Sequence, residues 1–122
     1  MALTALLGIA CGDTVDNNAM LEDVHNALPA EVTVQGAVTM LLSDSNGTDG
    51  PHENFDINVS GVVIHIVHNL SLAPRVPVKV GDTVVVHGQF EPDSSGPVIH
   101  YTHHQTSGHE GGYITLNGQT YQ

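Results

Sequence analysis

The stretch Phe55-Asp56-Ile57-Asn58-Val59-Ser60-Gly61-Val62-Val63-Ile64-His65-Ile66-Val67-His68 decides the fold class of this chain. Its first half alternates apolar and polar residues, which is typical of a β-strand with one buried face. Ser60-Gly61 has the composition of a two-residue hairpin turn. The resulting register sets His65 opposite Asp56 on the outer face, where we expect an ion pair.

Segments on both sides of this hairpin also show β character. They are residues 32–42, with a bend or bulge expected at Gly36, residues 83–90, residues 98–104, and a short ribbon at 113–116 around Asn117-Gly118. Residues 16–28 carry apolar side chains at helical spacing, with Asn17 or Asn18 as the cap and Pro29 as the end. Residues 44–51 have the composition of a turn-rich loop.

This order of elements predicts a mainly all-β fold, a small five-stranded OB-like barrel with one short N-terminal helix and a C-terminal β-ribbon. In that topology the first strand pairs with the second and fourth, and the third runs parallel to the fifth. An immunoglobulin-like sandwich would need about seven strands and fits less well. We divide the chain into an apolar segment (1–12), the helix (13–30) and the barrel (31–122).

The negative net charge of the chain limits the classes of partner that it can bind. Thirteen acidic residues against Lys79 and Arg75 give a formal net charge of −11. A phosphate backbone would be repelled, which argues against nucleic-acid binding. Charged residues make up 12% of the chain, about half the usual share. We therefore expect part of the surface to be covered by sugar, metal or another subunit. The runs 62–67 and 84–86, apolar on both faces, indicate a homo-oligomer or polymer, unless the helix covers them.

The N-terminus indicates export. An apolar run over residues 2–10 precedes the single cysteine, Cys11, and resembles the lipobox of a bacterial lipoprotein signal. The run lacks a preceding Lys or Arg, and Gly8 stands where Leu is usual. We expect an extracytoplasmic protein (secreted, cell-surface or periplasmic) with a lipid anchor at Cys11. The alternative is a retained arm that packs on the protein. Asn46, Asn58 and Asn69 stand in sequons, which would carry surface glycans if the source glycosylates exported proteins. The alternative is a set of coincidental matches in a Ser/Thr-rich strand protein.

Nine histidines are the best clue to chemistry, because neutral imidazole is the commonest protein ligand for transition metals. Barrel closure should bring the ends of the hairpin and of the last core strand to one rim. The histidines expected there are His52, His68, His103 and His104, with His100 on the same face as His104 and His109 folding back. We predict that these six residues bind Cu or Zn, with a carboxylate such as Glu53 or Asp82 completing the shell. The alternative is a set of separate histidines held by backbone or water.

Several short motifs carry a resemblance to a known family. They are His52 with Phe55, His68-Asn69, Leu72-Ala73-Pro74-Arg75-Val76-Pro77, Gly81-Asp82, Gly88, His100-x-Thr102-His103-His104, His109, Gly112-Tyr113 and Tyr121-Gln122. On these residues the stretch 34–122 resembles an uncharacterised bacterial family of small exported proteins, a domain of unknown function. The resemblance implies an OB-like barrel and export, without an activity. Glu53 and Tyr101 depart from the Gln and Trp of the family pattern, and His25, His65 and His87 fall outside it.

The leading functional hypothesis is a non-enzymatic, exported metal-binding module that self-assembles through metal and apolar contacts. The first alternative is a structural subunit of an extracellular filament or surface polymer without a functional metal. The second is a metal-dependent hydrolase, although no nucleophile motif accompanies the histidines.

Overall fold

Strand β1 (Ala30–Gly47) organises the fold because it pairs with two different strands. Up to Ala37 it pairs antiparallel with β4 (Thr83–Asp93), and from Ala37 onward with β2 (Gly50–Val59). Gly36 lies at the changeover, where a Cβ atom would come within 2.4 Å of the Asn58 carbonyl oxygen. Only glycine lets β2 approach so closely. The bulges expected at Gly36 lie further along, between Val38 and Met40 and between Leu42 and Ser45.

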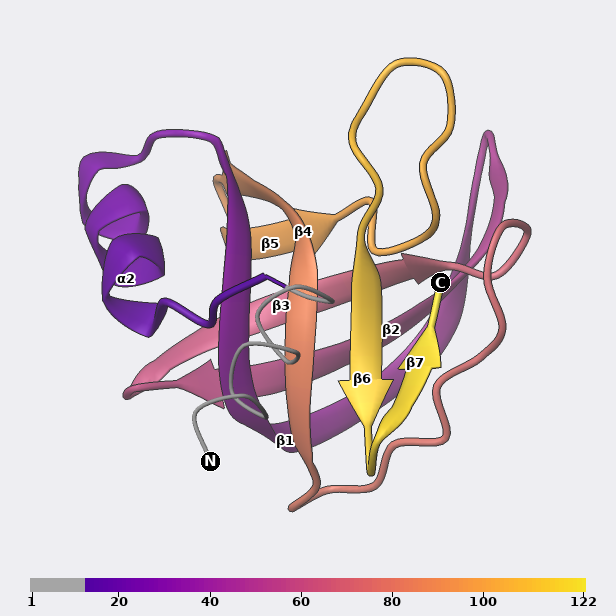
Figure 1. Cartoon of the computed structure of the whole chain (residues 1–122), viewed down its shortest axis with the longest axis horizontal. Helices are drawn as coiled ribbons and strands as arrows, with labels where there is room; N and C mark the ends of the chain where they lie inside the picture. Colours follow the sequence, from indigo (N-terminus) through magenta and orange to yellow (C-terminus); the bar gives the residue numbers. More distant parts are fainter. Residues whose placement is uncertain (1–12) are drawn as a thin grey trace, which may run out of the picture.

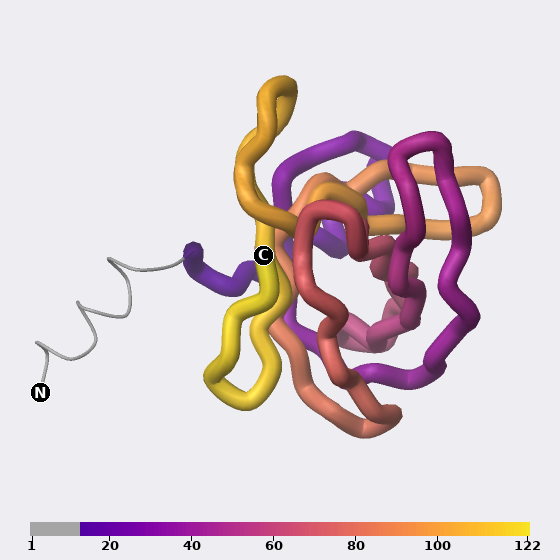
Figure 2. Tube along the Cα trace, turned by 90° about the vertical axis from the view of Figure 1, so that its right-hand side faces the viewer, coloured from indigo at the N-terminus to yellow at the C-terminus, as the bar shows by residue number. Residues whose placement is uncertain are grey.

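The described part of the computed structural model, residues 13–122, confirms the OB-like barrel. Strands β1, β2, β3 (Val62–Asn69), β5 (Gly96–His100) and β4 form a ring in that order (Figures 1 and 2). Closure is partial, because the parallel pairing of β3 with β5 contains only two residue pairs. The C-terminal ribbon, β6 (Tyr113–Leu116) and β7 (Gln119–Tyr121), extends the sheet from β4. The apolar segment 1–12, with Cys11, lies outside the described residues.

The hairpin of β2 and β3 has the predicted register, with Asp56 opposite His65. Ser60 and Gly61 have φ values of 50° and 96°, as a type I′ turn requires. Two other predicted boundaries are wrong. The turn-rich loop is shorter than expected, since β1 runs to Gly47 and β2 restarts at Gly50. Strand β5 ends at His100 instead of residue 104, because Tyr101 adopts a φ of 59° that no strand can continue.

Helix α2 (Asn17–Asn26) packs beside β1 and inserts Met20, which is fully buried, into the core. The core is otherwise made of inward-facing aliphatic residues of the ring together with Phe55 and Phe90. The helix cap is Asp16, whose carboxylate accepts a hydrogen bond from the Ala19 N–H at 3.0 Å. The predicted cap, Asn17, instead exchanges two hydrogen bonds with the backbone of Gln35 at 2.9 and 3.0 Å. Among residues 13–122, no helix has the length and apolarity to span a membrane.

A loop of residues 101–112 joins β5 to β6 and projects from the ring (Figure 1). Its base is closed by a hydrogen bond of 2.7 Å, which the Gly112 N–H donates to the His103 carbonyl. The loop therefore holds ionisable side chains against two neighbouring parts of the barrel.

Candidate metal centre

One histidine and two glutamates meet on the outer face of the barrel. Within residues 13–122, Glu31, His87 and Glu110 form the group whose potential ligand atoms all lie within 4.8 Å of one another. Glu31 comes from β1, His87 from β4 and Glu110 from the 101–112 loop. The register of β1 and β4 sets Thr33 opposite His87. Since alternate residues share a face, Glu31 lies on the same face one step away.

His87 is held in a defined orientation although it lies on the outer face. Its side chain is only 6% exposed, and its ring stacks on Tyr113 with centroids 5.4 Å apart. Nδ1 lies 2.7 Å from the Thr33 hydroxyl. Nε2 lies 3.0 Å from Glu110 Oε2 and 3.4 Å from Glu31 Oε1. Because a carboxylate can only accept, Nε2 donates its proton to Glu110 and Nδ1 accepts from the Thr33 hydroxyl. A metal ion would displace the Nε2 proton, and Nδ1 would then donate to Thr33, which is how metal-binding imidazoles are oriented.

The carboxylates of this group are in an unfavourable environment without a cation. Glu31 Oε1 is buried and has no hydrogen-bond partner within the described part of the chain. Burial and then the negative charge of Glu110 raise the pKa of Glu31. Asp13 adds a third carboxylate, 3.6 Å from His87 Nδ1, and accepts a hydrogen bond from the Tyr113 hydroxyl at 3.1 Å. A buried carboxylate oxygen beside a second negative charge is destabilising unless a proton or a cation compensates it.

The six histidines predicted from the sequence do not share one site. His52, His100 and His103 line one small cavity together with Asp49 and Tyr101. The rings of His104 and His109 lie 5.9 and 5.1 Å from the ring of His103, but their nitrogens make other hydrogen bonds. The assignment of all six histidines to one metal site stays a prediction.

His68 is fully buried, and both of its nitrogens are engaged. Nε2 donates to the Pro74 carbonyl at 2.9 Å, because a carbonyl can only accept. Nδ1 therefore accepts from the Thr102 hydroxyl at 2.7 Å. Burial lowers the pKa of His68. In this arrangement the imidazole ties two loops to β3 and has no free nitrogen for a cation.

His104 and His109 turn to other partners. His104 is exposed, and its Nδ1 donates to the Gln122 carbonyl at 3.0 Å. The ring of His109 stacks on Tyr101 at 4.0 Å, with Nδ1 donating to the Glu110 carbonyl and Nε2 near the Thr106 hydroxyl. Strand alternation does not govern these residues because β5 has already ended.

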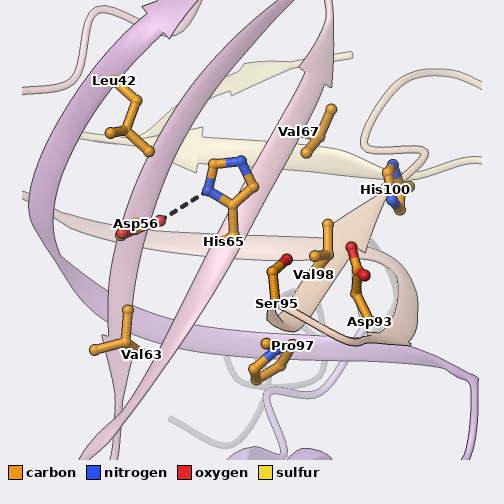
Figure 3. A pocket seen from close by; sticks show the side chains of 11 residues that line it. Leu42, Asp56, Val63, His65, Val67, Asp93, Ser95, Pro97, Val98 and His100 are labelled. Atoms are coloured by element: carbon orange, nitrogen blue, oxygen red, sulfur yellow. Dashed lines mark hydrogen bonds and ion pairs between the residues drawn. The ribbon is translucent and has the colours of Figure 1, made fainter.

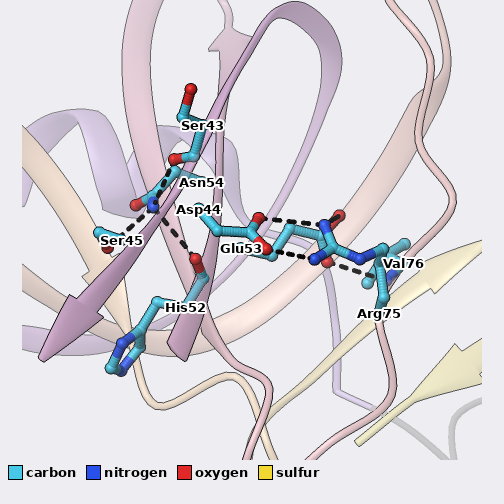
Figure 4. A network of polar contacts seen from close by, with 8 residues as sticks. All are labelled: Ser43, Asp44, Ser45, His52, Glu53, Asn54, Arg75 and Val76. Carbon is cyan, nitrogen blue, oxygen red and sulfur yellow. Dashed lines mark hydrogen bonds and ion pairs between the residues drawn. The ribbon is translucent and has the colours of Figure 1, made fainter. Parts of the chain in front are cut away.

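Glu53, the carboxylate expected beside His68, belongs to a separate network (Figure 4). It is buried, accepts a hydrogen bond from the Val76 N–H at 2.9 Å and lies 3.9 Å from Arg75. Burial raises the pKa of Glu53, whereas the Val76 hydrogen bond lowers it. Arg75 also pairs with Asp44 on β1. This network attaches the loop between β3 and β4 to the barrel wall. Asp82, the other carboxylate considered, accepts from the Lys79 N–H at 2.8 Å.

A cavity of about 480 Å³ lies on the outer face of β3 and β5 (Figure 3). His65 and His100 line it, between Leu42 of β1 and the turn that joins β4 to β5. The predicted contact between His65 and Asp56 is confirmed, with Nδ1 and Oδ1 2.8 Å apart. Nε2 of His65 lies 3.0 Å from Asn54 Oδ1. Because both nitrogens of His65 face acceptors, His65 has no free nitrogen for a metal in this cavity.

His87, together with His25 and His65, was left out of the six histidines predicted to bind metal, and Glu31 and Glu110 were not predicted as ligands. Alternation along β4 does place His87 outward, between inward-facing Val86 and Gly88. The register that brings Glu31 beside it joins strands far apart in the sequence, and no turn specifies it. Glu110 reaches the site from a loop, whose path no periodicity predicts.

Fold and site together define a class: a small OB-like β-barrel with a carboxylate–imidazole centre on its outer face. The chain belongs to the family described as protein of unknown function (DUF3465), whose model matches residues 3–122. No curated protein and no solved structure matches the chain.

Proposed function

We propose that this protein is a non-enzymatic metal-binding module whose metal centre consists of Glu31, His87 and Glu110. The observation that carries the proposal is the buried Glu31 Oε1, which has no hydrogen-bond partner among residues 13–122 and lies 3.4 Å from His87 Nε2. A buried acceptor without a donor is expensive. A divalent cation between these atoms would remove that penalty and would neutralise the repulsion between the two carboxylates.

The ligand set selects the class of metal. One imidazole nitrogen and two carboxylate oxygens suit Zn(II) and also accept Cu(II). Thr33 supports the imidazole from behind, and such outer contacts raise metal affinity. The net charge of −11 concentrates cations near the surface. Three protein ligands leave coordination positions for water.

Isothermal titration of the metal-free protein with Zn(II) tests this centre. We expect Glu31→Gln and Glu110→Gln each to weaken binding at least 10-fold, since each removes one charged ligand and keeps the side-chain shape. Glu22→Gln on α2 is the matched control, because it removes the same charge away from the centre. Wild-type affinity in the Glu31→Gln/Glu110→Gln double variant would refute the proposal.

We further propose that the protein is extracytoplasmic and self-assembles. Lipid attachment at Cys11 and glycosylation remain parts of this proposal. Asn46 is exposed and open to a glycan, whereas the Asn69 amide is buried and donates to Asp49 at 3.1 Å. Cell fractionation and mass spectrometry of the native protein test location and modification. Loss of oligomers on adding EDTA, measured by sedimentation, would identify metal as the link between subunits.

A structural polymer subunit without a functional metal is the second candidate, and one observation favours it. Beyond Ala37, β1 pairs with β2 alone among the described strands. Met40, Leu41 and Leu42, in this stretch, are exposed. An apolar strand edge is a ready site for pairing with another chain. Oligomers that persist in EDTA and disappear in a Met40→Lys/Leu42→Lys variant would support this candidate.

A further inference from the structure

A second group of imidazoles lies at the rim of the barrel, apart from the Glu31–His87–Glu110 centre. His52 at the start of β2, His100 at the end of β5 and His103 in the following loop line one cavity of about 140 Å³. The remaining lining residues are Asp49, Val67, Asn69 and Tyr101. Three nitrogen donors from three separate segments thus meet at one opening.

His103 is oriented as a metal ligand would be. The residue is 2% exposed, and its Nδ1 donates a hydrogen bond to the His104 carbonyl at 2.9 Å. The lone pair of the neutral ring is therefore on Nε2. Metal-binding histidines commonly donate the other N–H to a carbonyl or carboxylate, which fixes the tautomer.

His52 has the Asp49 carboxylate beside it, and its ring faces Gly47, which has no side chain. Its Nε2 lies 3.5 Å from Asp49 Oδ1. Its backbone carbonyl is held by the Asn54 amide at 3.3 Å (Figure 4). A Cβ atom at Gly47 would lie 3.3 Å from the His52 ring, so the glycine leaves room for the ring to turn. Asp49 can therefore act as a fourth ligand.

Tyr101 gives an independent indication that this rim is a functional site. It is a non-glycine residue with a φ of 59°, a strained conformation that is concentrated at binding sites. The strained backbone places the tyrosine ring among imidazoles, stacked on His109 at 4.0 Å and edge-on to His103 at 6.2 Å. Tyr101 thereby encloses the cavity from the loop side.

We propose that His52, His100 and His103, with Asp49, form a second metal site, rich in nitrogen and selective for Cu(II). Imidazole nitrogens in a tetragonal set favour Cu(II) over the other divalent first-row metals. The ligand atoms are less closely gathered than those around His87, so binding requires the His52 and His100 rings to rotate toward His103. The two sites then differ in chemistry, one mainly oxygen and the other mainly nitrogen.

Electron paramagnetic resonance of Cu(II) tests this second site on the full chain. Nitrogen hyperfine structure counts the bound imidazoles. In the Glu31→Gln/Glu110→Gln variant, which lacks the first centre, we expect one tight Cu(II) with two or three nitrogen ligands. Loss of all tight Cu(II) from that variant, or a spectrum with at most one nitrogen, would overturn the second site while leaving the first untouched.

A second comparison uses His52→Ala/His100→Ala, with His25→Ala on α2 as the control. We expect the double variant to lose the nitrogen-rich spectrum and to bind that Cu(II) at least 100-fold more weakly, and the control to behave as wild type. An unchanged nitrogen-rich spectrum in the double variant would refute the assignment. Zn(II) binding at the Glu31–His87–Glu110 centre, measured in the same protein, reports separately on the proposed function.

Discussion

We expect the Glu31→Gln variant to be more stable than wild type in the absence of metal and less stable than wild type when metal is present. The ligand oxygens of Glu31 and Glu110 lie within 4.8 Å of each other. At that separation two unit charges repel by about 1 kcal/mol in water and by about 3.5 kcal/mol at an effective dielectric constant of about 20. Since the Glu110 side chain is 57% exposed, the value near water applies.

We therefore expect Glu31→Gln to raise the free energy of unfolding in EDTA by about 1 kcal/mol, the repulsion that the substitution removes. In urea this corresponds to a rise in midpoint of about 0.5–1 M. Free Zn(II) at about 100 times its dissociation constant stabilises wild type by about 2.7 kcal/mol. The order of the two proteins should then reverse, because the variant has lost a ligand.

Urea unfolding at pH 8, followed by circular dichroism with EDTA and with Zn(II), measures both halves of this prediction. Glu22→Gln controls for the loss of a charge elsewhere. The reasoning fails if Glu31→Gln is less stable than wild type in EDTA, or if Zn(II) stabilises both proteins equally.

The remaining predictions concern the fold and also use urea unfolding. His68→Ala should destabilise the protein by about 2–4 kcal/mol, because it leaves a cavity and unpairs the Pro74 carbonyl and the Thr102 hydroxyl; a loss below about 1 kcal/mol would contradict this. The pKa of His68 is lowered by burial, so its contribution to stability is complete above about pH 6.5 and declines as the pH falls below that value. The midpoint should fall less between pH 7.5 and 5.5 in His68→Gln than in wild type, and an equal fall would refute the assignment. Gly88→Ala should cost about 2 kcal/mol or more, since the new Cβ would lie 2.5 Å from the His100 carbonyl oxygen; a neutral result would show that β5 can move.

The parts of the fold that were predictable are those with local signals. The Ser60-Gly61 turn sets the register of β2 and β3 without information from the rest of the chain. Helix α2 follows from apolar spacing, and its start differs by one or two residues because Asp16 takes the cap. The end of β5 could not be predicted, because nothing in the sequence around Tyr101 requires its positive φ.

The site was less predictable than the fold because it depends on contacts between residues that are distant in the sequence and carry no local signal. The sequence placed histidines at the correct rim, and three of them do line one cavity. Whether a particular imidazole is free, however, depends on its hydrogen-bond partners, and for His68 these come from Pro74 and Thr102. The Glu31–His87 pairing depends on a contact between strands separated by half the chain.

Because Gly112 donates a hydrogen bond to the His103 carbonyl, the residues between them form a loop that is closed at its base. Residues 104–111 can be exchanged or lengthened without shifting any ladder of the ring, because the chain leaves and re-enters at a fixed point. Glu110 lies inside this loop, and His103 is its anchor. Grafting a different sequence here would therefore change the outer carboxylate centre through Glu110, and it would also remove His109, which stacks on Tyr101 and lies 5.1 Å from the His103 ring. One loop thus contributes to both places, and a change in it is felt at each.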